Sequence, residues 1–270
     1  MGYGNVAKVL TIAGSDSGGG AGIQADLKTF QELGVYGMSA ITAVTAQNTT
    51  GVHGVYPLPP EAVAQQLRAI GDDLEPQALK TGMLFSSDII ETVAAQVRAY
   101  GWRRLVVDPV MIAKGGASLL REEAVAALCR SLLPLAEVVT PNLPEAETLS
   151  GLTIRTYADR LEAAERILAY GVKYVVIKGG HGEELDTSVD VLYGADTVVE
   201  YAAPRVATKQ THGTGCTFAA AIAAELGKGA SVRDAVSVAK SFVQAAIEHP
   251  LGIGSGHGPT NHWAYRESVR

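Results

Sequence analysis

The chain has 270 residues, of which 47% are hydrophobic and 19% charged, and its formal net charge is −6. This length and composition allow a sizeable buried core and exclude an intrinsically disordered protein. The sequence contains no run of five lysines and arginines, so it does not favour a protein that binds nucleic acid or an anionic membrane. Two cysteines, Cys129 and Cys216, are too few for a disulfide framework or a four-cysteine zinc site. Without a basic leader or a long apolar segment, we expect a cytoplasmic protein.

Short apolar segments alternate with helical patterns at a spacing of roughly thirty residues, the length of a βα unit. The segments are apolar throughout, which is typical of a parallel sheet that is covered on both faces. The sequence predicts strands over 6–13, 38–46, 78–84, 105–110, 137–140 and 174–178. It predicts the principal helices over 22–33, 61–74, 88–100, 215–226 and 231–249.

The pattern changes after residue 178. Residues 189–193 and 197–201 flank a short turn, which predicts an antiparallel hairpin at the edge of the sheet. No linker rich in serine, glycine and proline divides the chain, so we expect one α/β domain over residues 1–270.

Ligands of open parallel sheets bind beyond the carboxyl ends of the strands, so the residues that follow each strand are the informative ones. The glycine-rich segment 14–26 follows the first strand and lets backbone N–H groups face a ligand, although a tight strand-to-helix turn is the alternative. Gln47 ends the second strand and carries both a donor and an acceptor, which suits the edge of a heteroaromatic ring. A loop cap is the simpler interpretation of Gln47.

Polar residues also follow the later strands. Asp108 fits a contact with a metal or a metal–phosphate group, with a turn aspartate as the alternative. Asn142 and Glu145 are three residues apart at a strand-to-helix junction, where both can face one crevice or simply cap the helix. Lys178 could reach the phosphates of a nucleotide.

The segment 211–216 is the strongest functional signal. Backbone N–H groups of Gly213, Thr214, Gly215 and Cys216 would converge at the positive end of a helix dipole and form a pocket for phosphate charge. In that field we expect the thiol of Cys216 to have a depressed pKa. His212, together with His257 and His262, has no helical His-x-x-x-His partner, so a transition-metal site is not favoured.

Together these motifs resemble the ribokinase-like superfamily. The resemblance rests on Gly-Thr-Gly-Cys at 213–216, Asp-Pro-Val-Met at 108–111, Thr-Pro-Asn-x-x-Glu at 140–145 and Ile-Lys-Gly-Gly at 177–180. Within this superfamily, the chain most resembles the hydroxymethylpyrimidine/phosphomethylpyrimidine kinases of thiamin biosynthesis, which residues 11–30 match almost continuously. The resemblance covers nearly the whole chain and implies a three-layer αβα fold, a mostly parallel central sheet with an antiparallel edge hairpin, and a homodimer.

The resemblance also implies an activity, the phosphorylation by ATP and Mg²⁺ of 4-amino-5-hydroxymethyl-2-methylpyrimidine to its monophosphate and then its diphosphate. Gln47 would read the aminopyrimidine edge, and Cys216 would act beside the hydroxymethyl group within the Gly213–Gly215 turn. The pyrimidine pocket would be lined by Gly14, Asp26, Met83 and Val110. ATP would be held by Asn142, Glu145, Lys178 and Thr214, and Mg²⁺ by Asp108 and Glu145.

Several alternatives stay open at this point. Many members of the superfamily have aspartate where this chain has Cys216, which leaves the general base undecided. A pyridoxal or pyridoxine kinase of the same fold is the close alternative, although the two-sided amide of Gln47 favours the pyrimidine. A non-catalytic ligand sensor is the alternative from another class. An active-site cover over 113–118 or 181–188 is expected, since phosphoryl transfer requires the exclusion of water.

Overall fold

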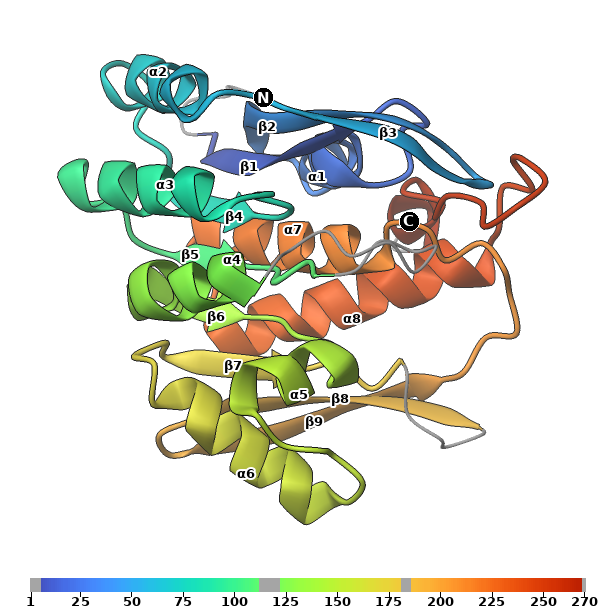
Figure 1. Ribbon diagram of the computed structural model, residues 1–270. Helices are drawn as coiled ribbons and strands as arrows, with labels where there is room; N and C mark the ends of the chain where they lie inside the picture. Colours follow the sequence, from blue (N-terminus) through green and yellow to red (C-terminus); the bar gives the residue numbers. More distant parts are fainter. Residues whose placement is uncertain (1–5, 112–121, 181–185, 269–270) are drawn as a thin grey trace.

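The computed structural model describes residues 6–111, 122–180 and 186–268 (Figure 1). Within these ranges one sheet of nine strands has the order β3-β2-β1-β4-β5-β6-β7-β8-β9. The strands are β1 (Lys8–Asp16), β2 (Tyr36–Asn48), β3 (Gly51–Pro57), β4 (Ala78–Thr81), β5 (Leu105–Val107), β6 (Ala136–Val139), β7 (Tyr174–Ile177), β8 (Thr187–Gly194) and β9 (Thr197–Pro204).

Helices cover both faces of the sheet. They are α1 (Gly22–Glu32), α2 (Pro60–Gly71), α3 (Ser87–Ala99), α4 (Glu122–Ala127), α5 (Leu143–Ser150), α6 (Tyr157–Leu168), α7 (Thr214–Gly227), α8 (Val232–Glu248) and α9 (Ala264–Ser268). A π-helical turn (Leu128–Leu132) and a 3-10 turn (Leu133–Leu135) follow α4. Among the described residues, no helix is both long and apolar enough to cross a membrane.

The six strands from β2 through β1, β4, β5 and β6 to β7 are parallel. The β8–β9 hairpin pairs antiparallel with β7, so the predicted edge hairpin is confirmed. The opposite edge carries β3, antiparallel to β2, which the sequence analysis missed. Its sequence contains two glycines and a proline, and none of its residues is buried, so it lacks the apolar run by which the other strands were found.

Two apolar cores give the three-layer arrangement (Figure 1). One face of the sheet packs against α2 to α6, and the other face packs against α1, α7 and α8. All residues over 217–227 of α7 are buried, and five of them are alanine, which lets this helix lie close to the sheet. The predicted mostly parallel αβα architecture is confirmed.

Because the six central strands run in the same direction, their carboxyl ends lie at one edge of the sheet. Most predicted strands end within a few residues of the observed ones, so the polar residues that follow them are brought to this edge. The largest differences are of three residues: β1 and β9 continue to Asp16 and Pro204, whereas β4 and β5 already end at Thr81 and Val107. The residues beyond these ends are loops, and these loops contribute to the site.

Candidate active site

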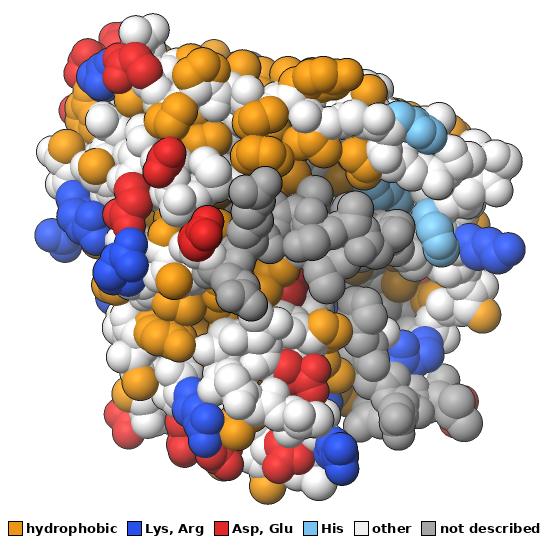
Figure 2. Space-filling view, in the orientation of Figure 1, with side chains coloured by type: hydrophobic (Ala, Val, Ile, Leu, Met, Phe, Trp, Pro, Cys, Tyr) orange, Lys and Arg blue, Asp and Glu red, His pale blue; other side chains and the backbone are white. Residues whose placement is uncertain are grey.

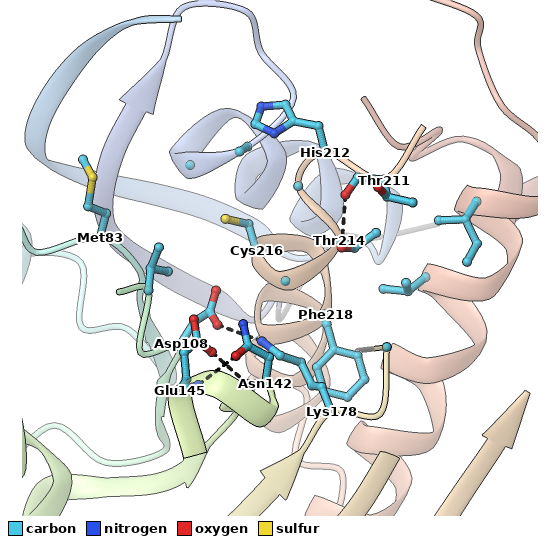
Figure 3. Close-up of a pocket in the computed structure, with 18 of the residues that line it drawn as sticks. Met83, Asp108, Asn142, Glu145, Lys178, Thr211, His212, Thr214, Cys216 and Phe218 are labelled. Atoms are coloured by element: carbon cyan, nitrogen blue, oxygen red, sulfur yellow. Dashed lines mark hydrogen bonds and ion pairs between the residues drawn. The ribbon is translucent and has the colours of Figure 1, made fainter. Parts of the chain in front are cut away.

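A cavity of about 720 Å³ opens at the carboxyl edge of the sheet. On the face shown in Figure 2, the described basic and acidic side chains are interspersed. Most of the predicted site residues line this one cavity, although they come from segments far apart in the sequence (Figure 3). They are Gly14, Gln47, Met83, Val110, Asp108, Asn142, Glu145, Lys178, Gly213, Thr214, Gly215 and Cys216.

A lysine and a carboxylate form the charged centre of the cavity. Nζ of Lys178 donates to Oδ1 of Asp108 at 3.1 Å, and its backbone N–H donates to the carbonyl of Pro141 at 2.9 Å. A Cβ added to Gly215 would lie 3.5 Å from Nζ of Lys178 and 3.6 Å from Asp108, so the glycine loop approaches this pair closely. The residues that follow β5 and β7 therefore lie close to the start of α7 (Figure 3).

Asn142 and Glu145 form a capping box at the start of α5. The backbone N–H of Glu145 donates to Oδ1 of Asn142 at 2.9 Å, and the backbone N–H of Asn142 donates to Oε2 of Glu145 at 2.8 Å. Both residues also line the cavity. The capping interpretation and the crevice interpretation are thus both correct.

The buried carboxyl of Glu145 is short of compensating positive charge. Burial raises its pKa to about 7, Asp108 adds to the rise, and Lys178 opposes it. Burial alone would lower the pKa of Lys178, but Asp108 and Glu145 hold it above its ordinary value. Two carboxylates that share one ammonium fit a divalent cation such as Mg²⁺, which binds one or two carboxylates together with phosphates and water. Among the described residues, no group of three His, Cys, Asp or Glu side chains is placed to hold a metal ion.

The glycine loop before α7 depends on close backbone approach. Gly213 has φ of +89°, and a Cβ there would overlap the carbonyl oxygen of Gly20. The hydroxyl of Thr214 donates to the carbonyl of Thr211 at 3.1 Å and closes the turn. Glycine at 213 therefore brings the start of α7 against the glycine-rich segment that follows β1.

The expectation of a low pKa for Cys216 is wrong. Burial raises the pKa of this thiol to about 11, and Asp26 and Asp108 add to the rise, whereas Lys80 and a backbone hydrogen bond from Gly22 oppose it. The helix N-terminus is present as predicted, but burial and the two carboxylates together raise the pKa above its ordinary value. In this structure Cys216 is a thiol at neutral pH.

Asp26 does not line the cavity, contrary to the expectation. It lies on the buried face of α1, where it accepts a hydrogen bond from Thr11 Oγ1 at 2.6 Å and pairs with Nζ of Lys80 at 2.9 Å. Lys80 stands between Asp26 and the cavity and itself lines the wall. The carboxylate is therefore one layer behind the site.

Three residues in this region had no assigned role in the sequence analysis: Asp16, Lys80 and His212. A lysine within an otherwise apolar predicted strand was a usable signal for Lys80, since a buried ammonium needs a buried partner. Nε2 of His212 lies 2.9 Å from Oδ2 of Asp16 and 3.2 Å from Nε2 of Gln47. No local pattern could pair residues so far apart along the chain. The expected cover over 113–118 lies outside the described residues, as do residues 181–185 of the second candidate.

A parallel sheet with a glycine anion loop, a buried lysine and paired carboxylates at its carboxyl edge is the arrangement of a ribokinase-like kinase. The phosphomethylpyrimidine kinase family model matches residues 16–261. The chain is 58% identical over 264 residues to the hydroxymethylpyrimidine/phosphomethylpyrimidine kinase of Bacillus subtilis, covering 98% of this chain and 97% of that protein. The chain belongs to the phosphomethylpyrimidine kinase family.

Solved structures are similar over almost the whole chain. The ADP complex of Bacillus subtilis pyridoxal kinase has a TM-score of 0.90 and 46% identity, covering 97% of this chain and 99% of that chain. The Staphylococcus aureus pyridoxal kinase in complex with AMP-PCP and pyridoxal also has a TM-score of 0.90, with 42% identity and coverage of 97% and 95%. Both neighbours are kinases with a nucleotide or nucleotide analogue bound.

Proposed function

We propose that this chain phosphorylates 4-amino-5-hydroxymethyl-2-methylpyrimidine to its monophosphate and then to its diphosphate, with ATP and Mg²⁺, for thiamin diphosphate biosynthesis. The observation that carries the proposal is that one cavity holds Gln47 together with the Lys178–Asp108 pair and the glycine loop before α7. This reaction needs a group that hydrogen-bonds the ring and a group that binds phosphate. The amide of Gln47 can donate to and accept from the ring, and Lys178 with the backbone N–H groups before α7 can bind phosphate.

In this proposal, the acceptor ring lies against Gly14, Met83 and Val110, with its amino edge at Gln47. A Cβ at Gly14 would overlap the methyl end of Met83, so glycine at this position lets Met83 lie close against the strand end. Leaving the amide of Gln47 without a partner is costly, and this cost is the basis of selectivity for the aminopyrimidine.

At the other end of the cavity, we assign the nucleotide to Asn142, Glu145, Lys178 and Thr214. When bound between Asp108 and Glu145, Mg²⁺ would neutralise phosphate charge. Lys178 and the N–H groups at Gly213–Cys216 would orient the transferred phosphoryl group and stabilise its equatorial oxygens.

The first acceptor is an alcohol, which must lose its proton as its oxygen attacks phosphorus. Cys216 is the proposed proton acceptor, and it must act through the small fraction that is thiolate at neutral pH. The ammonium of Lys80 favours that form, whereas burial, Asp26 and Asp108 oppose it. The second acceptor is a phosphate monoester that is already largely anionic at neutral pH and needs no base.

Phosphorylation of pyridoxal is the second candidate, favoured by the likeness to pyridoxal kinases over 97% of the chain. The deciding experiment is an ATP-consumption assay with hydroxymethylpyrimidine and pyridoxal in parallel and with products separated by charge. Pyrimidine mono- and diphosphate would support the proposal. Pyridoxal phosphate alone would replace the acceptor while retaining the nucleotide site, and no turnover of either would favour a ligand sensor.

We also propose that residues 1–270 act as one kinase domain and that the protein is a cytoplasmic homodimer. The single domain is supported by the continuous sheet, whose strands lie between residues 8 and 204, and by α7 and α8, which pack against it. Light scattering coupled to size exclusion measures the mass in solution, and a monomer at assay concentration would refute the dimer.

A further inference from the structure

The side-chain amide of Gln47 lies between two hydrogen-bonding residues. One end of the amide is 3.2 Å from Nε2 of His212, and the other is 3.2 Å from Oγ1 of Thr45. Which end carries the oxygen decides what the amide can offer a ligand. The oxygen and nitrogen of a primary amide exchange places by a half-turn, so the hydrogen-bonding needs of the neighbours determine the orientation.

Asp16 requires a proton on Nε2 of His212. Oδ2 of Asp16 accepts from the backbone N–H groups of Gly20 and Ala21 at 3.0 and 2.8 Å, and Nε2 of His212 lies 2.9 Å from the same oxygen. Burial raises the pKa of Asp16, but hydrogen bonds from His212 and the backbone outweigh this and hold the pKa below its ordinary value. Asp16 is therefore a carboxylate, which can only accept. Nε2 of His212 is the donor, and because its one hydrogen is directed to Asp16 it has no lone pair that could accept an N–H of Gln47.

Thr45 imposes the matching requirement on the other end of the amide. Its hydroxyl has one hydrogen, and the carbonyl oxygen of Ser15 lies 3.0 Å from Oγ1 in position to accept it. Oγ1 then offers Gln47 a lone pair. Nε2 of His212 thus excludes the NH₂ group of Gln47, whereas Oγ1 of Thr45 needs an N–H from it.

Both requirements are met when the oxygen of the Gln47 amide faces His212 and its NH₂ group faces Thr45. We propose that Asp16 and His212 are positioning residues that hold Gln47 in this orientation and thereby set the preference for a ring that carries an amine beside an acceptor nitrogen. In this orientation one N–H and one oxygen lone pair of Gln47 remain for the ligand, and an aminopyrimidine edge pairs with both. The inference rests on the proposed function, because it takes Gln47 as the group that reads the ring.

The backbone around His212 supports a fixed rather than an adaptable contact. The N–H of His212 donates to the carbonyl of Gly258 at 3.0 Å, and a Cβ at Gly20 would collide with the imidazole ring. The ring is largely buried between two glycine loops, which is the close approach that glycine at 20 and 213 permits. Because Asp16 fixes the ring of His212 and Gly258 fixes its backbone, the side chain of Gln47 has one favourable orientation.

The test measures a preference rather than an activity. The substrates are the aminopyrimidine alcohol and the same alcohol without its amino group, and the readout is the ratio of their dissociation constants by calorimetry together with the ratio of their kcat/KM values. For His212→Leu we expect the preference for the amino compound to fall about tenfold, with kcat little changed. His212→Gln supplies an N–H at a similar reach and should retain most of the preference. His53→Leu removes a histidine that bonds the exposed Asn48 and should leave the preference unchanged.

A double-variant cycle separates positioning from general damage. Gln47→Met should remove the preference, and adding His212→Leu to it should remove no more. Equal weakening of both ligands by His212→Leu, or additive losses in the cycle, would overturn the inference. Should His212→Leu fail to fold, Thr45→Val removes the other partner of the amide, and an unchanged ratio there would overturn it too.

Failure of the inference and failure of the proposed function give different results. A wild-type protein that phosphorylates neither compound refutes the function and the inference with it. A wild-type protein that phosphorylates the pyrimidine while Gln47→Met keeps the preference leaves the reaction standing and overturns only the inference.

Discussion

Nζ of Lys80 lies 2.9 Å from Oδ2 and 3.1 Å from Oδ1 of Asp26, and neither side chain is exposed to solvent. The pair joins β4 to α1 directly behind the cavity wall. Burial alone would lower the pKa of Lys80, but Asp26 holds it above the ordinary value, so the lysine is charged. The ammonium of Lys80 thus acts electrostatically on Cys216, and its pairing with Asp26 stabilises the fold.

Replacing Lys80 with methionine should destabilise the protein severely. The substitution leaves the carboxylate of Asp26 buried without a counter-charge, which typically costs about 3–5 kcal/mol. Urea unfolding measures the change, and adding Asp26→Asn should recover part of it. Arg68→Ala, which breaks an exposed ion pair with Glu61, is the matched control and should have little effect. Equal stability of the Lys80 variant and wild type would contradict this account.

Gly213→Ala should abolish activity and lower stability, because the added Cβ would overlap the carbonyl of Gly20 at a positive φ. Gly34→Ala is the matched control, since Gly34 also has positive φ, +72°, but nothing lies within 4 Å of the added carbon. We expect the control to lose only about 1 kcal/mol and to keep its activity. Thermal unfolding and turnover of both variants test the difference, and similar behaviour of the two would refute the close-approach explanation.

The alkylation of Cys216 should depend steeply on pH. Its pKa is raised to about 11. At pH values well below 11, each increase of one pH unit therefore raises the thiolate fraction tenfold. The rate of reaction with iodoacetamide, followed by mass spectrometry in a Cys129→Ser background, should rise without levelling between about pH 7 and pH 10. A plateau near pH 8 would show that the helix field lowers the pKa after all.

Cys216→Ala should slow the first phosphorylation far more than the second. A positioned base contributes about 10²–10⁴-fold to transfer onto an alcohol, and a monoester that is already anionic gains nothing from it. Single-turnover rates with the alcohol and with its monophosphate give the two effects separately. Equal losses would mean that Cys216 shapes the anion pocket rather than accepting the proton.

Lys178→Met should slow both phosphorylations alike, by about 10²-fold or more, because each transfer develops the same charge on the phosphoryl oxygens. It also leaves Asp108 without its 3.1 Å partner. The same single-turnover measurement serves as the test. A loss confined to one acceptor would contradict the placement of Lys178 at the nucleotide.

The elements and the ends of the strands could be predicted from the sequence because they depend on local patterns. Apolar runs separated by about one βα unit defined the parallel sheet, and the polar residues after those runs were found where the sheet brings its carboxyl ends together. Gln47, Asp108, Asn142 and Lys178 all line the cavity for this reason. Edge strand β3 was missed because it has no buried run.

What only the tertiary structure decided is burial and the identity of distant partners. The thiol of Cys216 lies at a helix N-terminus as its motif predicts, yet its burial among the packed layers and the carboxylates of Asp26 and Asp108 raise its pKa. Asp26 faces Lys80 rather than the cavity, and His212 meets Asp16 196 residues earlier in the chain. Local sequence specifies which groups are present and at which strand ends they lie. Solvation and charge compensation depend on atoms from every packed layer, so they exist only once the chain has folded.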